Sequence, residues 1–349
     1  MESKIIIVTG ISGSGSRNFC RRYAKDNKVK LYHTGDMVYE LAQSYPEGPP
    51  VPKENLLNLQ PDILNGLRNK AFDVILGNLE QDRKEYDKIL IDTHAEFFWN
   101  HVYTNAYDSK YLNEILADIF VTIIDKPSAI KERQMKTAHG RVQDHDYRDL
   151  LLWQNIEVNV TKDWASRSGK PMYIFSNKQN PDVMDSLIEN YFLIYSSFPM
   201  TDAGSDANRR IDNFKTRLRN LRKEIDGKET PIIDPADIDV ETDAGLSERI
   251  RDTIGAQTVH RDLNRDITQS THIVAYYPDA RALSKGVSDE CTRGRQTGKF
   301  VYVICPREKM SPFMDIAHKV FKDEEEFFAF FREHMKEALE YFKRSNFKK

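Results

Sequence analysis

Short apolar runs of strand length, separated by segments with helical spacing, recur along this 349-residue chain. In the first half the clearest runs are KIIIVTG (4–10), KILIDTH (88–94), IFVTIID (119–125) and PMYIFS (171–176). The segments between them favour helices, among them residues 16–25, 62–81 and a long polar–apolar stretch at 129–164. Strands that alternate with helices predict a parallel sheet with helices on both faces. We therefore expect an α/β fold.

The alternation restarts near residue 190. Four further strands are predicted at YFLIYSSF (191–198), PIID (231–234), HIVAYY (272–277) and FVYVIC (300–305). Helices are expected at about 206–225, 245–271 and 290–296, and the last element (323–344) is amphipathic. A chain of this length holds two domains of ordinary size. The sequence thus predicts two doubly wound parallel-sheet domains, residues 1–190 and residues 191–349.

Charge and composition exclude several classes of protein. The formal net charge is only −3, so nucleic acid is not expected as the main partner. The apolar runs are too short to span a bilayer, and no basic and apolar leader precedes the first strand, which predicts a cytoplasmic protein without a membrane partner. Three cysteines without metal-ligand spacing, Cys20, Cys291 and Cys305, fit a reducing compartment. Cys291 stands beside Glu290 and is either a reactive thiol or a small packing residue.

The stretch VTGISGSGSRNF (8–19) follows a strand and opens a helix, which is the setting of a phosphate-binding loop. Gly10, Gly13 and Gly15 allow successive backbone N–H groups to surround a phosphate. A lysine and then a serine or threonine complete such a loop in phosphoryl-transfer proteins, but Ser16 and Arg17 stand in those places. Arg17 is the nearest substitute cation.

Several segments, in this order along the chain, resemble the archaeal-type adenylate kinases and related small nucleotide kinases. They are GISGSGS (10–16), HTGDMVYELAQ (33–43), LIDTHA (90–95), IDKPSAIKERQ (124–134) and SGKPMYIFSN (168–177). The resemblance implies a P-loop kinase-like domain that takes ATP and Mg²⁺. It also implies that Gly10, Gly13, Gly15 and Ser16 hold nucleotide phosphates, that Asp36 and Asp92 lie near the acceptor nucleotide or a metal, and that Arg133 and Arg141 are lid arginines. Because phosphoryl transfer depends on positive charge, the missing lysine argues against efficient catalysis.

A second resemblance covers about residues 191–330. Its segments are FLIYSSF (192–198), PIIDP (231–235), HRDLNRDITQSTHIVAYY (260–277) and SKGVSDECTRGRQTGKFVYVICP (284–306). This order is similar to that of the nucleoside 2-deoxyribosyltransferases and the related 2'-deoxynucleoside 5'-monophosphate N-glycosidases. The resemblance implies a Rossmann-like domain that breaks an N-glycosidic bond without an organic cofactor, in sites completed by a second copy of the chain.

That chemistry assigns roles to residues of the second domain. Positive charge develops on the sugar as the bond breaks, and a carboxylate stabilises or traps it, so Glu290 is the candidate nucleophile. The leaving base needs a second acid, for which Asp262 is the candidate and Asp266 the rival. The candidates for binding substrate are Ser284, Gly286 and Ser288, for the 5'-hydroxyl or 5'-phosphate, and Tyr195, for the base.

Each of these residues also has a structural interpretation. Glu290 at the start of a helix would complement the helix dipole, and the two aspartates would be solvated helix residues. Ser284 would simply form a turn, and Tyr195 and Tyr276 would pack in the core with a wet hydroxyl. No spacing of Asp, Glu or His commits to a metal site.

Three functions remain open from the sequence. The first is cleavage or transfer at the N-glycosidic bond of a nucleoside or its monophosphate, with the kinase-like domain binding a nucleotide. The second is a nucleoside monophosphate kinase that uses ATP and Mg²⁺. The third is a nucleotide sensor that has lost both chemistries. All three predict a small nucleoside or nucleotide as the ligand, and a homodimer or larger homo-oligomer is expected.

Overall fold

The computed structural model describes residues 3–25, 28–44, 51–107, 109–181, 183–190, 192–199, 205–237, 248, 252, 262–279, 284–306 and 316–346. The chain divides into two compact units. The first comprises Met1–Pro181 and Val240–Ile254, and the second comprises Asp182–Asp239 and Gly255–Lys349. Each unit is an α/β structure built on its own five-stranded sheet.

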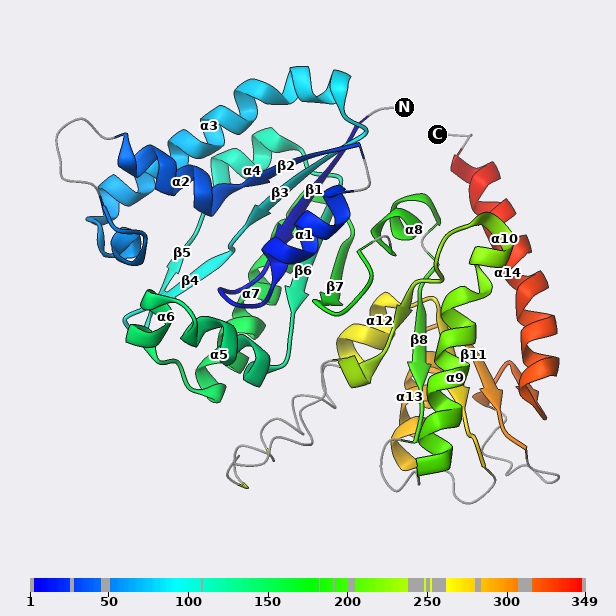
Figure 1. Cartoon of the computed structure of the whole chain (residues 1–349). Coiled ribbons are helices and arrows are strands. Elements are labelled where there is room, and N and C mark those ends of the chain that lie inside the picture. Colours follow the sequence, from blue (N-terminus) through cyan, green and yellow to red (C-terminus); the bar gives the residue numbers. More distant parts are fainter. Residues whose placement is uncertain are drawn as a thin grey trace. The chain divides into compact units, whose positions relative to one another are not determined.

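The sheet of the first unit is parallel, in the order β2-β3-β1-β6-β7. Its strands are β1 (Lys4–Thr9), β2 (Val29–His33), β3 (Lys88–Thr93), β6 (Ile119–Ile124) and β7 (Met172–Ser176). The central strands β1, β3 and β6 are almost completely buried, which is why they read as continuous apolar runs in the sequence. Their carboxyl ends meet at one edge, and the glycine-rich loop leaves β1 there (Figure 1).

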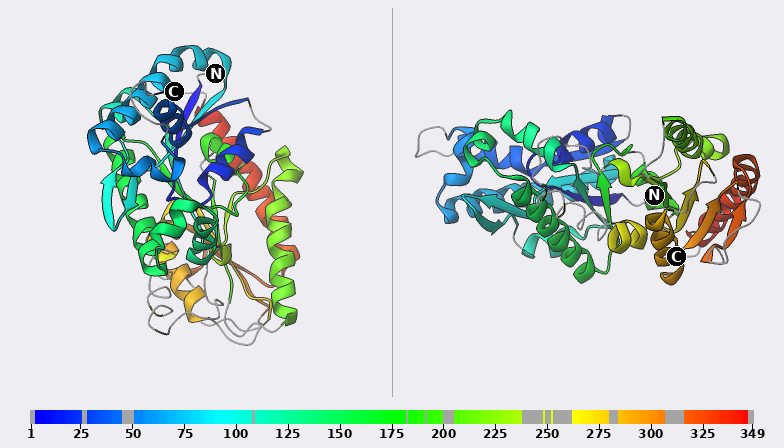
Figure 2. Two further views of the ribbon diagram at one scale, coloured as in Figure 1. Left: turned by 60° about the vertical axis from the view of Figure 1, so that its left-hand side comes forward. Right: turned by 90° about the horizontal axis from the view of Figure 1, so that it is seen from below.

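Helices cover both faces of this sheet (Figures 1 and 2). On one face, α3 (Pro61–Glu85), α4 (Ser109–Ile115) and α7 (Tyr147–Ser168) bury an apolar cluster against Ile5, Ile7, Ile89 and Ile91. On the other, α1 (Ser16–Lys25) buries Phe19, Cys20 and Tyr23. Beyond the sheet lie α2 (Thr34–Gln43), the 3₁₀ helix η1 (Lys53–Asn58) and an antiparallel hairpin of β4 (Glu96–Trp99) and β5 (Val102–Asn105). The sequence did not predict this hairpin.

The long helical stretch expected at 129–164 is instead three helices: α5 (Pro127–Met135), α6 (Ala138–Gln143) and α7. Thr137 caps α6 through its side chain, which accepts from the Gly140 N–H. Asp144 adopts a left-handed conformation that ends α6, and Asp146 forms a capping box with Asp149 at the start of α7. These short polar side chains bond to nearby backbone groups more favourably at helix ends than within a helix, which accounts for the breaks.

The second unit also has a parallel sheet, in the order β12-β11-β10-β8-β9. Its strands are β8 (Ile194–Ser197), β9 (Ile232–Ile233), β10 (His272–Tyr276), β11 (Phe300–Ile304) and the unpredicted β12 (Lys319–Phe321). Counted from β8, this is the doubly wound order 2-1-3-4-5, in which ligands bind at the carboxyl ends of the strands where the order reverses. That place lies between β8 and β10.

Helices α9 (Ser205–Leu221) and α14 (Glu324–Asn346) pack on one face of the second sheet around Phe214, Phe327 and Phe331. The opposite face carries α13 (Lys285–Gln296), whose Gly294 lies so close to Ile273 that a Cβ would come within 2.6 Å of it. Shorter helices are α8 (Val183–Asn190) and α10 (Lys223–Asp226), and a single 3₁₀ turn, η2, spans Pro235–Asp237. Tyr276 stacks on Phe214 and donates to Glu324, so it is a core residue with a bonded hydroxyl.

Two helices of the second unit differ from the sequence-based expectation in where they begin or in how much of them is described. The helix carrying Glu290 begins at Lys285, so Glu290 lies in its second turn and does not complement the helix dipole from the first. Gly298, at φ 74°, follows the end of that helix as the sequence predicts. Most of the helix expected at 245–271 lies outside the described residues, and its described end is a π-helical turn, η3 (Asp262–Asp266), followed by α12 (Ile267–Gln269).

No helix in the described parts of the chain is both long and apolar enough to cross a membrane. The three cysteines are buried, and none of them forms a disulfide. Burial, and next the neighbouring Glu290 carboxylate, raise the pKa of the Cys291 thiol to about 12. Cys291 is therefore a packing residue and not a reactive thiol.

Candidate functional site

The glycine-rich loop between β1 and α1 has the backbone that a phosphate-binding loop requires. Gly13 and Gly15 have φ of 87° and 93°, a region that side chains disfavour. A Cβ on Gly15 would also come within 2.5 Å of the Asn177 side chain. The Gly10 N–H is already donated to Glu157, so the amides left for a ligand are those further along the loop.

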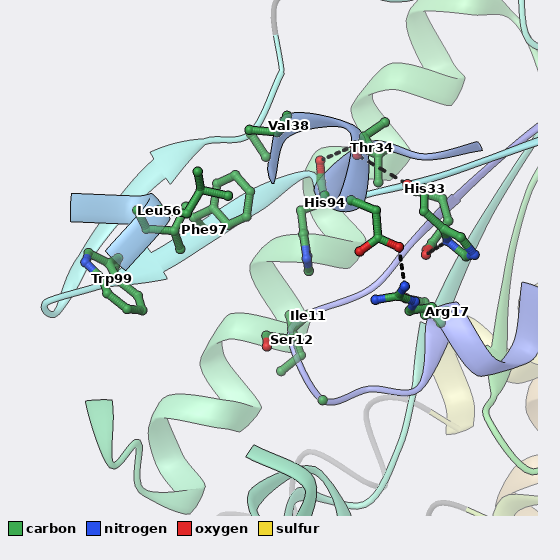
Figure 3. Close-up of a pocket in the computed structure, with 18 of the residues that line it drawn as sticks. Ile11, Ser12, Arg17, His33, Thr34, Val38, Leu56, His94, Phe97 and Trp99 are labelled. Carbon is green, nitrogen blue, oxygen red and sulfur yellow. Dashed lines mark hydrogen bonds and ion pairs between the residues drawn. The ribbon is translucent and has the colours of Figure 1, made fainter. Parts of the chain in front are cut away.

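A cavity of about 460 Å³ opens beside this loop. Six of the seven predicted nucleotide-binding residues line it, all except Gly10: Gly13, Gly15, Ser16, Arg17, Asp36 and Asp92. Apolar side chains gather at one end, and Arg17 and His33 lie at the other (Figure 3). The apolar end is formed by Val38, Leu56, Phe97 and Trp99, which come from α2, η1 and the β4–β5 hairpin.

Arg133 of α5 brings a guanidinium group against the loop. Its Nε donates to the Gly13 carbonyl at 2.6 Å, and its Nη2 lies 2.5 Å from the buried Asp125 carboxylate. The next residue, Gln134, donates to the Ser12 carbonyl at 2.6 Å. Arg17, the substitute cation expected from the sequence, lines the same cavity and pairs with Asp36, as Arg133 pairs with Asp125, but no hydrogen bond joins Arg17 to the loop carbonyls in the described structure. Arg133 is thus the cation that the fold fixes on the loop itself.

His33 and Asp92 form a pair in the cavity wall. His33 Nδ1 lies 2.8 Å from Asp92 Oδ2, and both side chains are largely buried. Thr34 holds the start of α2 against the end of β3, because its hydroxyl lies within hydrogen-bond distance of the Asp92 carbonyl, at 3.3 Å, and of the Thr93 hydroxyl, at 3.0 Å. The position of His33 is therefore set by the junction between β3 and α2 (Figure 3).

The residues present do not form the usual magnesium set of a P-loop protein, which combines a loop hydroxyl after the lysine with a strand-end carboxylate. Arg17 stands at the hydroxyl position, and one oxygen of Asp92 is engaged by His33. No group of three or more His, Cys, Asp or Glu side chains within the described ranges could hold a metal ion. We therefore assign no protein ligand for Mg²⁺ and no step that passes through it.

Glu157 of α7 is a fully buried carboxyl group behind the loop. It accepts backbone N–H groups from Gly10 at 3.0 Å, Ala95 at 2.8 Å and Glu96 at 2.9 Å. Burial raises its pKa to about 8, although these three hydrogen bonds act in the opposite direction. One side chain thus joins the phosphate loop to the hairpin that forms the apolar end of the cavity.

In the second unit the fold brings together Glu290, Tyr195 and Ser197. Tyr195 donates to Glu290 Oε1 at 2.8 Å, and the Ser197 hydroxyl donates to Oε2. Both donors come from β8, next to the place where the strand order reverses. Tyr195 is completely buried. Its role in the structure is therefore to donate a hydrogen bond to Glu290, and its ring offers no exposed surface on which a base could stack.

The other residues predicted for this site lie on two neighbouring elements. Ser284 is the N-cap of α13, and Gly286 and Ser288 lie in its first turn, so the segment expected as a turn is a helix N-terminus. Asp266 is buried at the end of η3, and the side chain of Asp262 lies outside the described residues. Arg293 donates to the Leu263 carbonyl and the Asn264 side chain, which ties α13 to η3.

The sequence did not single out several residues that line the cavity or hold its walls in place. Glu157 stands on the buried side of α7 between Trp153 and Thr161, so a charged residue within an apolar helical pattern was the available signal. His33 stands two residues before Gly35 in the HTGD segment but was not singled out. His272 is buried, and burial with His334 nearby lowers its pKa to about 3. His260 lies outside the described residues.

A parallel sheet whose first strand leads through a glycine-rich loop into a helix, with a cavity beside that loop, defines a P-loop nucleotide-binding domain. Residues 9–150 match the family described as AAA domain. The chain is 22% identical over 177 residues to an adenylate kinase of Thermoplasma acidophilum, which covers 50% of this chain and 91% of that protein. It is also 22% identical over 180 residues to an adenylate kinase of Methanothermobacter thermautotrophicus. That match covers 51% of this chain and 92% of the relative. The N-terminal half is an adenylate kinase-like P-loop domain.

Solved structures give partial matches only. A sugar kinase from a Janibacter species is 14% identical with a TM-score of 0.30, covering 53% of this chain and 93% of that one. A putative kinase from Chloroflexus aurantiacus is 9% identical with a TM-score of 0.33, covering 54% and 97%. At TM-scores this low, these matches add nothing to the assignment.

Proposed function

We propose that the first unit binds a nucleoside triphosphate on the loop Gly13–Arg17 and transfers its terminal phosphoryl group to a small acceptor in the same cavity. The observation that carries this proposal is the single cavity of about 460 Å³, with the phosphate loop at one side and an aromatic pocket at the other. Cavities of this size suit nucleotide-sized ligands. The kinase-like relatives of the N-terminal half support the same class of reaction.

The missing loop lysine is the main objection to this proposal, and Arg133 answers it. Its guanidinium group is fixed by Asp125 and the Gly13 carbonyl, beside the amides that would hold the phosphates. A preorganised cation at this place stabilises the charge that develops on the transferred group.

The test is incubation of the purified chain with radiolabelled ATP and a panel of nucleosides and nucleoside monophosphates. Transfer of label to any member, lost on substitution of Arg133, supports the proposal. Absence of both nucleotide binding and transfer would exclude it.

The second unit has a candidate function of its own, cleavage or transfer at an N-glycosidic bond. The observation that favours it is the Glu290 carboxylate, which both Tyr195 and Ser197 bind next to the switch point of the sheet. Two hydrogen bonds fix the carboxylate where a nucleophile or charge stabiliser is needed. Ser284, Gly286 and Ser288, at the N-terminus of the same helix, would receive a 5'-hydroxyl or 5'-phosphate.

Release of free base from nucleosides or nucleoside monophosphates, measured by chromatography, tests this second function. We expect Glu290→Gln to abolish release and Asp289→Asn, at the exposed neighbouring position, to leave it unchanged. No release from any substrate, with or without an acceptor base, would exclude glycosidic chemistry.

A further inference from the structure

The His33–Asp92 pair leaves two buried polar atoms at the cavity without a hydrogen-bond partner in the described structure, His33 Nε2 and Asp92 Oδ1. A carboxylate only accepts hydrogen bonds, so the bond of 2.8 Å places a proton on His33 Nδ1. The neutral ring then carries a lone pair on Nε2. Buried polar atoms almost always have a partner, and His33 lines the cavity, so a group of a bound ligand is the partner that fits.

The apolar end of the cavity, where the body of an acceptor would lie, offers little free positive charge. Arg68 lies 4.6 Å from the centroid of the Phe97 ring and donates to the Asn65 side chain and the Asn105 carbonyl. Lys53 forms an ion pair with Asp36. Both are already engaged, and the other arginines that line the cavity, Arg17, Arg21 and Arg133, come from α1 and α5, the helices beside the glycine-rich loop. A monophosphate group would need such cations for its own charge.

A hydroxyl group differs from a phosphate in needing a base. An acceptor phosphate is already ionised at neutral pH, whereas a hydroxyl must lose its proton as it attacks, and kinases that act on hydroxyl groups supply a residue for that proton. An oriented histidine with a free lone pair is such a residue, and a carboxylate that holds the opposite nitrogen fixes its tautomer.

Resting on the phosphoryl transfer proposed above, the geometry points to an acceptor that presents a hydroxyl group on a flat apolar body, as a nucleoside does, with His33 as the base and Asp92 as its orienting residue. The acceptor proton passes to His33 Nε2 while the acceptor oxygen bonds to the terminal phosphorus of the nucleoside triphosphate. The bond between that phosphorus and the bridging oxygen breaks, and the nucleoside diphosphate leaves with the electron pair.

The experiment offers full-length protein γ-labelled ATP with either nucleosides or nucleoside monophosphates and separates the products by thin-layer chromatography. The variants are His33→Gln, Asp92→Asn and the double substitution. The control is His101→Asn on the exposed hairpin tip, where φ is 59° and asparagine is tolerated. Binding of a fluorescent ATP analogue is measured for every variant, so that loss of fold or of nucleotide affinity is separated from loss of transfer.

We expect label to pass to nucleosides, and each single variant to lower kcat by roughly 10²-fold or more while the ATP analogue still binds. The double variant should be no worse than the worse single one, because the two residues act as a unit. Transfer to monophosphates alone, or a His33→Gln rate equal to that of His101→Asn, would overturn the inference of a hydroxyl acceptor with His33 as its base. The proposed phosphoryl transfer itself would still stand. Binding without transfer to either class also overturns the inference, and absence of nucleotide binding removes the proposed function itself.

Discussion

At the scale of single residues, the first unit replaces the parts of a P-loop kinase site with other side chains. Ser16 stands where the loop lysine is usual, and Arg133 reaches the loop from a helix more than a hundred residues later. In the phosphoryl transfer proposed above, Arg133 takes the part of the missing lysine. The two arrangements differ in the rigidity of the cation, because Asp125 fixes the guanidinium group of Arg133, whereas the ammonium group of a lysine at position 16 would be mobile.

Removal of the Arg133 charge should lower phosphoryl transfer, and restoration of a lysine should recover part of it. We expect Arg133→Ala to reduce kcat by about 10²-fold, the usual effect of losing one donor to a developing charge. Adding Ser16→Lys to that variant should raise kcat again. Lys136→Ala, one residue past the end of α5 and exposed, is the matched control. An Arg133→Ala rate equal to that of the control would contradict the role of Arg133.

Glu157 should make the stability of the first unit depend on pH. Its folded pKa of about 8 lies above the unfolded value near 4.5, so the folded state binds more protons between these values. The free energy of unfolding should therefore fall as pH rises from about 4.5 to about 8. All three tryptophans, Trp99, Trp153 and Trp164, belong to this unit, so their fluorescence during urea unfolding reports on it.

Glu157→Gln should remove this pH dependence and lower stability. The amide oxygen can still accept two of the three backbone N–H groups, but the amide nitrogen then faces the third, at a cost of about 1–3 kcal/mol. The comparison is urea unfolding of both proteins at pH 5 and pH 9. Equal pH slopes in the two proteins would show that another group is responsible.

At the scale of elements, the loop between β1 and α1 depends on its backbone more than on its side chains. Gly15 combines a positive φ with the close approach of Asn177, so only glycine fits without rearrangement. The break of the predicted long helix into α5, α6 and α7 is the second element-level feature, because it places Arg133 and Gln134 at a helix end beside the loop.

Gly15→Ala should weaken nucleotide binding by about tenfold or more while the unit stays folded, because the added Cβ forces the loop away from Asn177. Gly66→Ala, on the exposed side of α3 with no atom within 4 Å of the added Cβ, is the matched control and should leave affinity unchanged. Calorimetric titration with ATP measures both. Equal affinities in the two variants would indicate that the loop does not hold the phosphates.

At the scale of the whole molecule, two α/β units with separate sheets carry separate candidate sites. The first site lies on the loop after β1, and the second lies around Glu290 between β8 and α13. Joining them in one chain suggests that the nucleotide bound by the first unit feeds or controls the chemistry of the second.

If that link exists, ATP should change the rate of base release by the second unit, and the Gly13→Ala/Gly15→Ala double variant should lose the effect. Base release in the absence of ATP should be the same in both proteins, since the substituted loop lies outside the second unit. Chromatography of the released base with and without ATP gives the measurement. An ATP response that persists in the double variant would exclude this control route.

The sequence by itself determined the α/β class, the central strands of both sheets and the glycine-rich loop, because these depend on local apolar periodicity and on glycine spacing. It also indicated residues that share one cavity, since consecutive parallel strands end at one edge. The pairing of Arg133 with the loop, of His33 with Asp92, and of Tyr195 and Ser197 with Glu290 was decided only by the tertiary structure. Each joins residues far apart in the chain, and no local pattern encodes which buried polar groups will meet. The antiparallel hairpin and the capping of α6 and α7 were missed because short polar side chains and tight turns outweighed helical periodicity there.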